Sequence, residues 1–92
     1  MTARHEDAAP GVTLRYWAAA KAAAGTAEER VDAGTLAQAL DAVRGRHDDG
    51  FARVLDRCSY LVDGDPVGVR DHGAVAVTRT GVVDVLPPFA GG

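Results

Sequence analysis

Only one stretch of this sequence has both the apolar spacing and the end signals of an amphipathic helix, and shorter strand-like stretches lie on either side of it. Four of its apolar residues recur at i, i+3, i+4 and i+7 and so share one helical face: Leu36, Ala39, Leu40 and Val43. Thr35 is a typical N-cap, Gln38 follows three residues later as its capping-box partner, and Gly45 ends the helix. A lone helix of this kind buries its apolar face against a sheet.

The residues before this helix predict two strands joined by a short helix. Residues 12–17 predict a strand, in which apolar residues alternate with Thr and Arg before an aromatic residue at 17. This pattern places three residues on one strand face: Val12, Leu14 and Tyr16. Residues 18–24 are all Ala except Lys21, which predicts a short helix, and Gly25 follows where a left-handed cap is favoured. Residues 28–32 are interpreted as a second strand that returns beside the first.

The residues after the main helix predict one further helical turn and a hairpin. Residues 51–55 have helical apolar spacing over a single turn. The apolar run at 60–62 leads into Asp63-Gly64, a dipeptide typical of tight hairpin turns. We therefore expect a strand, a turn and a short second strand that contains Val67 and Val69.

The last apolar run, residues 82–86, predicts the final strand. Val83 and Val85 are expected to point toward the core, while Asp84 between them faces outward. One main helix among these strands makes an α+β domain, and the element order suits a ubiquitin-like β-grasp. In this fold one main helix lies across a mixed sheet of four or five strands. The periodicities predict a shared core: Leu14, Tyr16, Leu36, Leu40, Val43, Leu61, Val83 and Val85.

Charge and composition limit the classes of partner. The 92 residues carry ten basic and thirteen acidic side chains, a formal charge of −3, which argues against binding nucleic acid by phosphate neutralisation. No apolar run approaches the roughly 20 residues that cross a bilayer, and residues 1–10 lack the apolar region of a signal peptide. We expect a cytoplasmic protein with a disordered tail at 1–10, a β-grasp domain at 11–86 and an extended tail at 87–92.

Few residues suggest catalysis or metal binding by this chain alone. The histidines His5, His47 and His72 are scattered and have no ligand pair at metal spacing, so no metal site is predicted. The acidic pairs at 48–49 and 63–65 are interpreted as solvated turns, because neither has the loop that calcium sites require. Cys58 is the only cysteine, and a buried thiol is favoured over a nucleophile because no His is placed to act as its base.

The ending LPPFAGG is the most distinctive stretch. Pro87-Pro88 cannot donate to a sheet ladder and favour an extended course, so the final strand should end at Leu86 and continue as a stiff stalk. Leu86 and Phe89 flank the diproline and are expected to form an exposed apolar patch that docks partners. The alternative is that Phe89 folds back onto the domain. Gly91-Gly92 lack side chains and could enter a channel that excludes bulkier residues.

Five stretches together resemble the ubiquitin-like sulfur carriers: the strand VTLRYWA, the turn KAAAG, the helix start TL, the strand and turn YLVDG, and the ending VLPPFAGG. The nearest branch is the small subunit of molybdopterin synthase, and the resemblance covers residues 11–92. This branch tends to have an aromatic residue at the position of Leu86 and a β-branched one at that of Phe89.

The resemblance implies a non-catalytic carrier with no bound cofactor or metal. An adenylating activating enzyme would use ATP to adenylate the carboxylate of Gly92, which becomes a thiocarboxylate that donates sulfur inside the large catalytic subunit of molybdopterin synthase. Gly92 would then be the reactive residue, and the partner contacts would come from the residues before it: Leu86, Pro87, Pro88, Phe89, Ala90 and Gly91. The alternatives are a sulfur carrier for thiamine or cysteine biosynthesis, a ubiquitin-like protein modifier, or an interaction domain.

Overall fold

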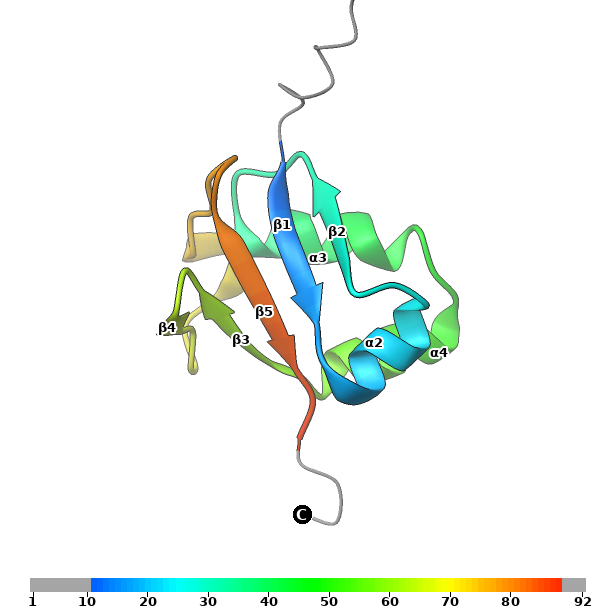
Figure 1. The fold of residues 1–92 in the computed structure, drawn as a ribbon. Coiled ribbons are helices and arrows are strands. Elements are labelled where there is room, and N and C mark those ends of the chain that lie inside the picture. Colours follow the sequence, from blue (N-terminus) through cyan, green and yellow to red (C-terminus); the bar gives the residue numbers. More distant parts are fainter. Residues whose placement is uncertain (1–10, 89–92) are drawn as a thin grey trace, which may run out of the picture.

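A five-stranded mixed sheet forms one layer of the structure, and α3 runs behind it in Figure 1. The computed structural model describes residues 11–88. The sheet has the strand order β2-β1-β5-β3-β4. Its strands are β1 Val12–Tyr16, β2 Glu28–Val31, β3 Ser59–Val62, β4 Asp65–Pro66 and β5 Val82–Leu86. β1 and β5 run parallel and the other neighbouring pairs run antiparallel. The predicted α+β fold class, a ubiquitin-like β-grasp with a mixed sheet, is confirmed.

Three α-helices and one 3-10 turn complete the described part of the chain: α2 Ala18–Ala24, α3 Leu36–Arg44, α4 Asp49–Asp56 and η1 His72–Ala74. α2 ends as predicted, because Gly25 adopts the left-handed conformation at φ 76°. The single turn predicted at 51–55 is wrong in length, since α4 has eight residues. Asp48, interpreted as part of a solvated turn, instead caps α4, and its side chain accepts a hydrogen bond of 3.0 Å from the backbone N–H of Phe51.

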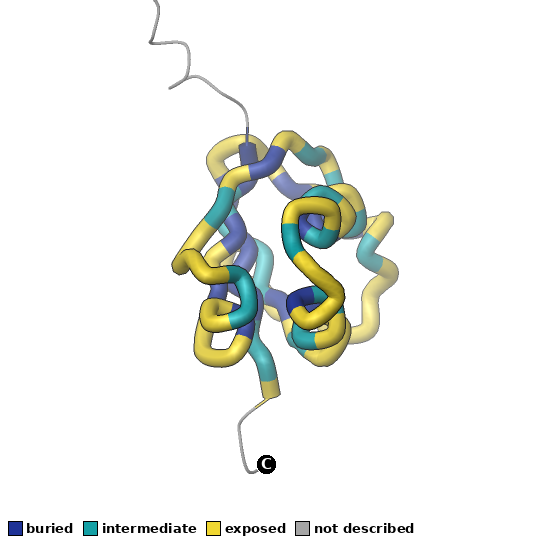
Figure 2. The backbone as a smooth tube through the Cα atoms, turned by 90° about the vertical axis from the view of Figure 1, so that its right-hand side faces the viewer, coloured by how far each residue is buried: buried dark blue, intermediate teal, exposed yellow. Residues whose placement is uncertain are grey.

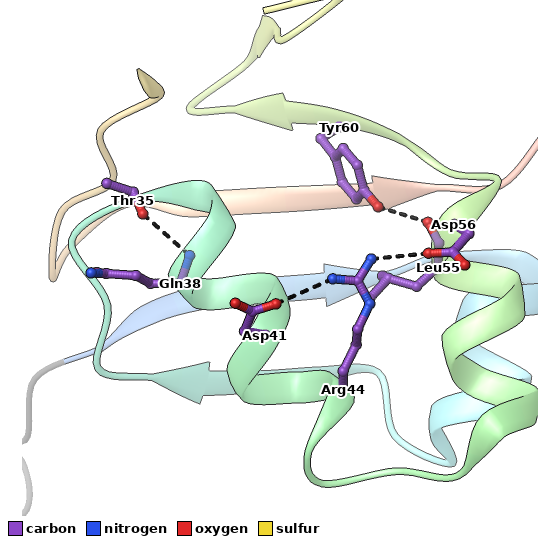
Figure 3. A network of polar contacts seen from close by, with 7 residues as sticks. All are labelled: Thr35, Gln38, Asp41, Arg44, Leu55, Asp56 and Tyr60. Carbon is purple, nitrogen blue, oxygen red and sulfur yellow. Dashed lines mark hydrogen bonds and ion pairs between the residues drawn. The ribbon is translucent and has the colours of Figure 1, made fainter. Parts of the chain in front are cut away.

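The cap of α3 differs from the predicted capping box in one bond. Thr35 Oγ1 accepts from the backbone N–H of Gln38 at 3.2 Å, as predicted (Figure 3). The Gln38 side chain, however, accepts from the N–H of Gly34 at 2.8 Å, one residue before the cap. At the other end of α3, Arg44 reaches the carboxylate of Asp56 in α4 at 3.0 Å (Figure 3). This exposed ion pair links the two helices.

The core lies between the sheet and the helices, and the most deeply buried segments face one another there (Figure 2). Every predicted core residue except Leu61 is buried. The prediction for Leu61 is wrong because Tyr60, its neighbour in β3, points inward and is only 6% exposed. Side chains alternate along a strand, so Leu61 falls on the outer face, where it is paired with Asp84 of β5. Phe51 and Leu55 of α4 are also fully buried.

The hairpin after β3 turns at Asp63-Gly64 as predicted, but its second strand is shorter than expected. β4 ends at Pro66, and Val67 is buried whereas Val69 is fully exposed. Gly68, at φ 59°, takes the left-handed conformation that interrupts an extended course. The predicted strand through Val69 is therefore wrong. Within residues 11–88, none of the helices has the length and apolar character needed to cross a membrane.

Candidate functional site at the end of β5

The predicted partner-binding residues begin where β5 ends. β5 stops at Leu86, as the diproline predicted; Leu86 and Pro87 are half-buried and Pro88 is exposed. Phe89, Ala90, Gly91 and Gly92 lie outside the described residues, so their predicted roles remain predictions. The same holds for the tail expected at 1–10.

The parallel pairing of β1 with β5 brings the start of α2 beside the end of β5. The backbone N–H of Trp17, the residue between β1 and α2, donates to the carbonyl of Val85 at 3.2 Å. An open apolar cavity of about 500 Å³ lies here, and we call it the tail-root groove. It is lined by Trp17, Ala18, Ala19, Ser59, Leu86, Pro87 and Pro88.

Four of the lining residues were not predicted from the sequence: Trp17, Ala18, Ala19 and Ser59. Trp17 is the largest of them. Its side chain is on the outer face of the sheet, because the preceding Tyr16 points into the core, and the residue is 48% exposed. The indole N–H donates to the carboxylate of Asp84 at 2.9 Å, and the Arg15 guanidinium lies 5.8 Å from the ring centroid. The signal available in the sequence was an aromatic residue out of phase with the buried face of its strand.

Asp84 faces outward as predicted, but it is not exposed. The residue is only 8% accessible, because Arg15 and Trp17 on β1 cover it. Arg15 donates from both Nε and Nη2 to the carboxylate, at 2.9 and 3.2 Å. Burial by itself would raise the pKa of Asp84, but the hydrogen bonds from Arg15 and Trp17 and the charge of Arg15 outweigh it and hold the pKa below the ordinary value.

A second polar cluster joins β2 to the connection between α3 and α4. The Glu29 carboxylate accepts from the Tyr16 hydroxyl at 2.7 Å, and Nε2 of His47 lies 2.7 Å from the same oxygen. Burial opposes ionisation of Glu29, but the hydrogen bonds from His47 and Tyr16 and the nearby positive charges lower its pKa overall. The His47 ring also packs on Phe51. None of these residues lines the tail-root groove, so we assign the cluster a structural role.

The remaining candidates also have structural surroundings. Cys58 is half-buried, donates to the carbonyl of Val54 at 3.2 Å, and burial raises its pKa to about 11, which disfavours a nucleophilic role. Asp63 accepts from the backbone N–H of Val82 at 2.8 Å and thereby fixes the turn after β3. Across residues 11–88, no three His, Cys, Asp or Glu side chains gather closely enough to hold a metal ion.

Neither a protein-family model nor a curated protein sequence matches the chain. Solved structures do. Small archaeal modifier protein 1 from Methanosarcina acetivorans superposes with a TM-score of 0.77 at 16% identity, over 90% of this chain and 97% of that one. The modifier protein 1 of Haloferax volcanii gives 0.73 at 26% identity, over 89% and 99%.

A third match is a chain from the complex of subunits 1 and 2 of the molybdopterin-converting factor of Helicobacter pylori. It gives a TM-score of 0.62 at 20% identity, over 88% of this chain and 97% of that one. These superpositions confirm the ubiquitin-like β-grasp fold that the sequence predicted.

Proposed function

We propose that this chain, a β-grasp protein close in structure to small archaeal modifiers and to a molybdopterin-converting factor, carries sulfur as a thiocarboxylate on Gly92. The observation that carries the proposal is the end of β5. There a diproline follows the last residue of a ubiquitin-like sheet, and the sequence continues Phe-Ala-Gly-Gly. A tail of this composition is thin at its end and stiff at its base.

The chemistry requires no catalytic group on this chain. A carboxylate is a poor acyl donor, so an activating enzyme would first join the Gly92 carboxylate to the α-phosphate of ATP and release pyrophosphate. Hydrosulfide then attacks the acyl carbon, a new C–S bond forms, and AMP leaves with the former carboxylate oxygen. The thiocarboxylate so formed would supply sulfur to a partner. The chain acts as a non-catalytic carrier subunit.

The tail-root groove supports docking of a partner beside the tail. Trp17 is one of two large apolar residues that are exposed in the described part of the chain, and it stands where the tail leaves the sheet. Exposed aromatic residues in pockets commonly anchor protein interfaces. The neighbour from Helicobacter pylori comes from a complex of two subunits of a molybdopterin-converting factor, which supports a larger catalytic subunit as the partner and molybdopterin biosynthesis as the pathway.

The test is intact-protein mass spectrometry of the native protein, which also establishes whether Gly92 is its last residue. After incubation with the activating enzyme, ATP and a sulfur source, the mass should rise by about 16 Da, as one oxygen is replaced by sulfur in the acyl group. Deleting Gly92, or adding Ala after it, should abolish the gain, since displacement of a reacting atom costs on the order of a hundredfold in rate. A Val69→Ala variant, altered at a fully exposed position outside the groove, should be modified normally.

An unmodified native chain would contradict the proposal, as would full pathway activity in cells from a form without Gly91 and Gly92. Two neighbours are named as modifiers, so a second candidate function is conjugation of Gly92 to amines of other proteins. In that case ATP and cell extract should convert the chain into species of higher mass whose tryptic peptides carry the tail on lysine.

A further inference from the structure

We propose that the partner docked at the tail-root groove presents a protein segment in which carboxylates flank an apolar side chain. Three exposed cations stand beside the groove and would pair with these carboxylates; we call them the basic rim: Lys21, Arg53 and Arg57. The chemistry of the segment is inferred from the rim and the groove. That the segment belongs to an enzyme that receives the tail rests on the proposed function.

The basic rim lies on two helices next to the groove. α2 packs against both α4 and β5, at the end of the molecule where the tail leaves the sheet (Figure 1). Lys21 is three residues after Ala18, a lining residue, so their Cβ atoms are about 5–6 Å apart on the helix. Arg57 is two residues before Ser59, another lining residue, which limits the separation of their Cα atoms to about 7 Å. Arg53 is one helical turn before Arg57.

The three charges of the basic rim have no ion-pair partner among residues 11–88. Two carboxylates near the rim are already bound: Asp56 to Arg44 at 3.0 Å, and Asp84 to Arg15 at 2.9 Å. Although the whole chain has a formal charge of −3, the rim is therefore locally positive. A positive surface of this kind attracts and orients a partner that carries negative charge.

The groove requires an apolar side chain at the centre of the docked segment. Apart from Ser59, every lining residue is apolar, and the volume is about 500 Å³. A dry apolar cavity of about 150 Å³ already accepts benzene, so a side chain of the size of leucine or phenylalanine fits. The Trp17 indole N–H is bound to Asp84 at 2.9 Å, and it keeps this partner when an apolar group covers the ring. Because the indole is ordered beforehand, binding against it costs little additional entropy.

Nucleic acid fits this surface less well than an acidic protein segment does. Nucleic-acid sites depend on extended stripes of Lys and Arg that neutralise many phosphates. Here three cations border an apolar groove in a chain of negative net charge. Apolar contact at the centre with charged groups at the edge is the usual arrangement of a protein–protein interface.

The test is a titration of the native chain with a synthetic peptide of blocked ends, in which two glutamates flank one leucine on each side. Trp17 is the only tryptophan, so its fluorescence reports on the groove. Binding should shift the emission to shorter wavelength, because the leucine excludes water from the indole. Raising the salt from about 0.1 M to about 1 M should weaken binding, since the Debye length falls from about 10 Å to about 3 Å. The same peptide with lysines in place of the glutamates should not bind.

Charge reversal identifies the residues of the rim. Arg53→Glu and Arg57→Glu should each raise the Kd of the glutamate peptide about three- to tenfold, because repulsion replaces an exposed ion pair. The matched control is Arg30→Glu. Arg30 is also exposed and without an ion pair among residues 11–88, but its partner in β1 is Thr13, about 10 Å along the strand from Tyr16. This control should leave the Kd unchanged, and urea melts verify that each variant is folded.

Several results would overturn the proposal. The glutamate peptide fails to bind at millimolar concentration, binds no better than the lysine peptide, or is insensitive to salt. Arg30→Glu weakens binding as much as Arg57→Glu does. Tighter binding of a single-stranded oligouridylate would assign the rim to phosphates, and an emission shift on dilution of the protein alone would identify a second copy of the chain as the occupant. None of these measurements involves ATP or sulfur, so failure of this proposal and failure of the carrier function are distinguishable.

Discussion

Replacing Asp84 by Asn tests whether the outer face of the sheet is held by a charged cluster. Asn keeps the size of the side chain and one acceptor oxygen, but it loses the charge that pairs with Arg15. The carboxylate side chain is 11% exposed and accepts three hydrogen bonds, at 2.9, 2.9 and 3.2 Å. Hydrogen bonds to charged groups contribute about 1.5–3 kcal/mol. The Arg15 side chain is 47% exposed, so solvent screens the pair and we expect a loss of about 1–2 kcal/mol in the free energy of unfolding.

The lowered pKa of Asp84 predicts how the stability difference between the native chain and Asp84→Asn changes with pH. The pKa of Asp84 is lowered from 3.8 in the folded protein, so the ionised form stabilises the fold at pH values above the unfolded pKa. The stability gap between the native chain and Asp84→Asn should therefore be constant near neutral pH and narrow as the pH falls below about 4, where the unfolded carboxylate is half protonated. Urea melts at a series of pH values from about 3, just below the ordinary Asp pKa of about 3.9, to about 7 measure the stability gap and its change with pH.

Two results would refute the reasoning about Asp84. Equal unfolding midpoints at neutral pH would show that the cluster adds no stability, and a gap that does not narrow in acid would show that the charge is not its source. A double-mutant cycle with Arg15→Gln separates the pairwise interaction from the effects of each substitution alone.

Three further predictions concern the fold and the thiol. Leu40→Ala should lose about 2–5 kcal/mol of stability, as other core leucines do, while Leu61→Ala on the outer face should lose clearly less; equal urea midpoints would contradict the assignment of Leu61. Gly25→Ala should lower stability by about 1–2 kcal/mol, the strain of a left-handed conformation at a residue with a Cβ, since nothing lies within 4 Å of the added Cβ to clash; an unchanged thermal midpoint would refute this. Cys58, with its pKa raised to about 11, should react with iodoacetamide much more slowly than glutathione at pH 7; a comparable rate would show an activated thiolate.

Features of this structure that depend on residues close together in the chain could be predicted from the sequence. Gly25 caps the end of α2 and Thr35 caps the start of α3, and such caps depend on residues only a few positions away. α3 also buries the face that its 3.6-residue spacing defines. The end of β5 at Leu86 follows from the diproline alone. The motif that carries the functional proposal, from Leu86 to Gly92, is likewise readable in the sequence.

The outer face of the sheet was decided only by tertiary structure. In the run Tyr60-Leu61-Val62 all three residues are apolar, so the sequence holds no signal for which of them points inward, and packing places Tyr60 in the core. Arg15 and Asp84 are 69 positions apart, and only the parallel pairing of β1 with β5 brings their side chains together. The same pairing sets Trp17 beside Leu86 and forms the groove. Contacts of this kind depend on strand order, which no local propensity encodes.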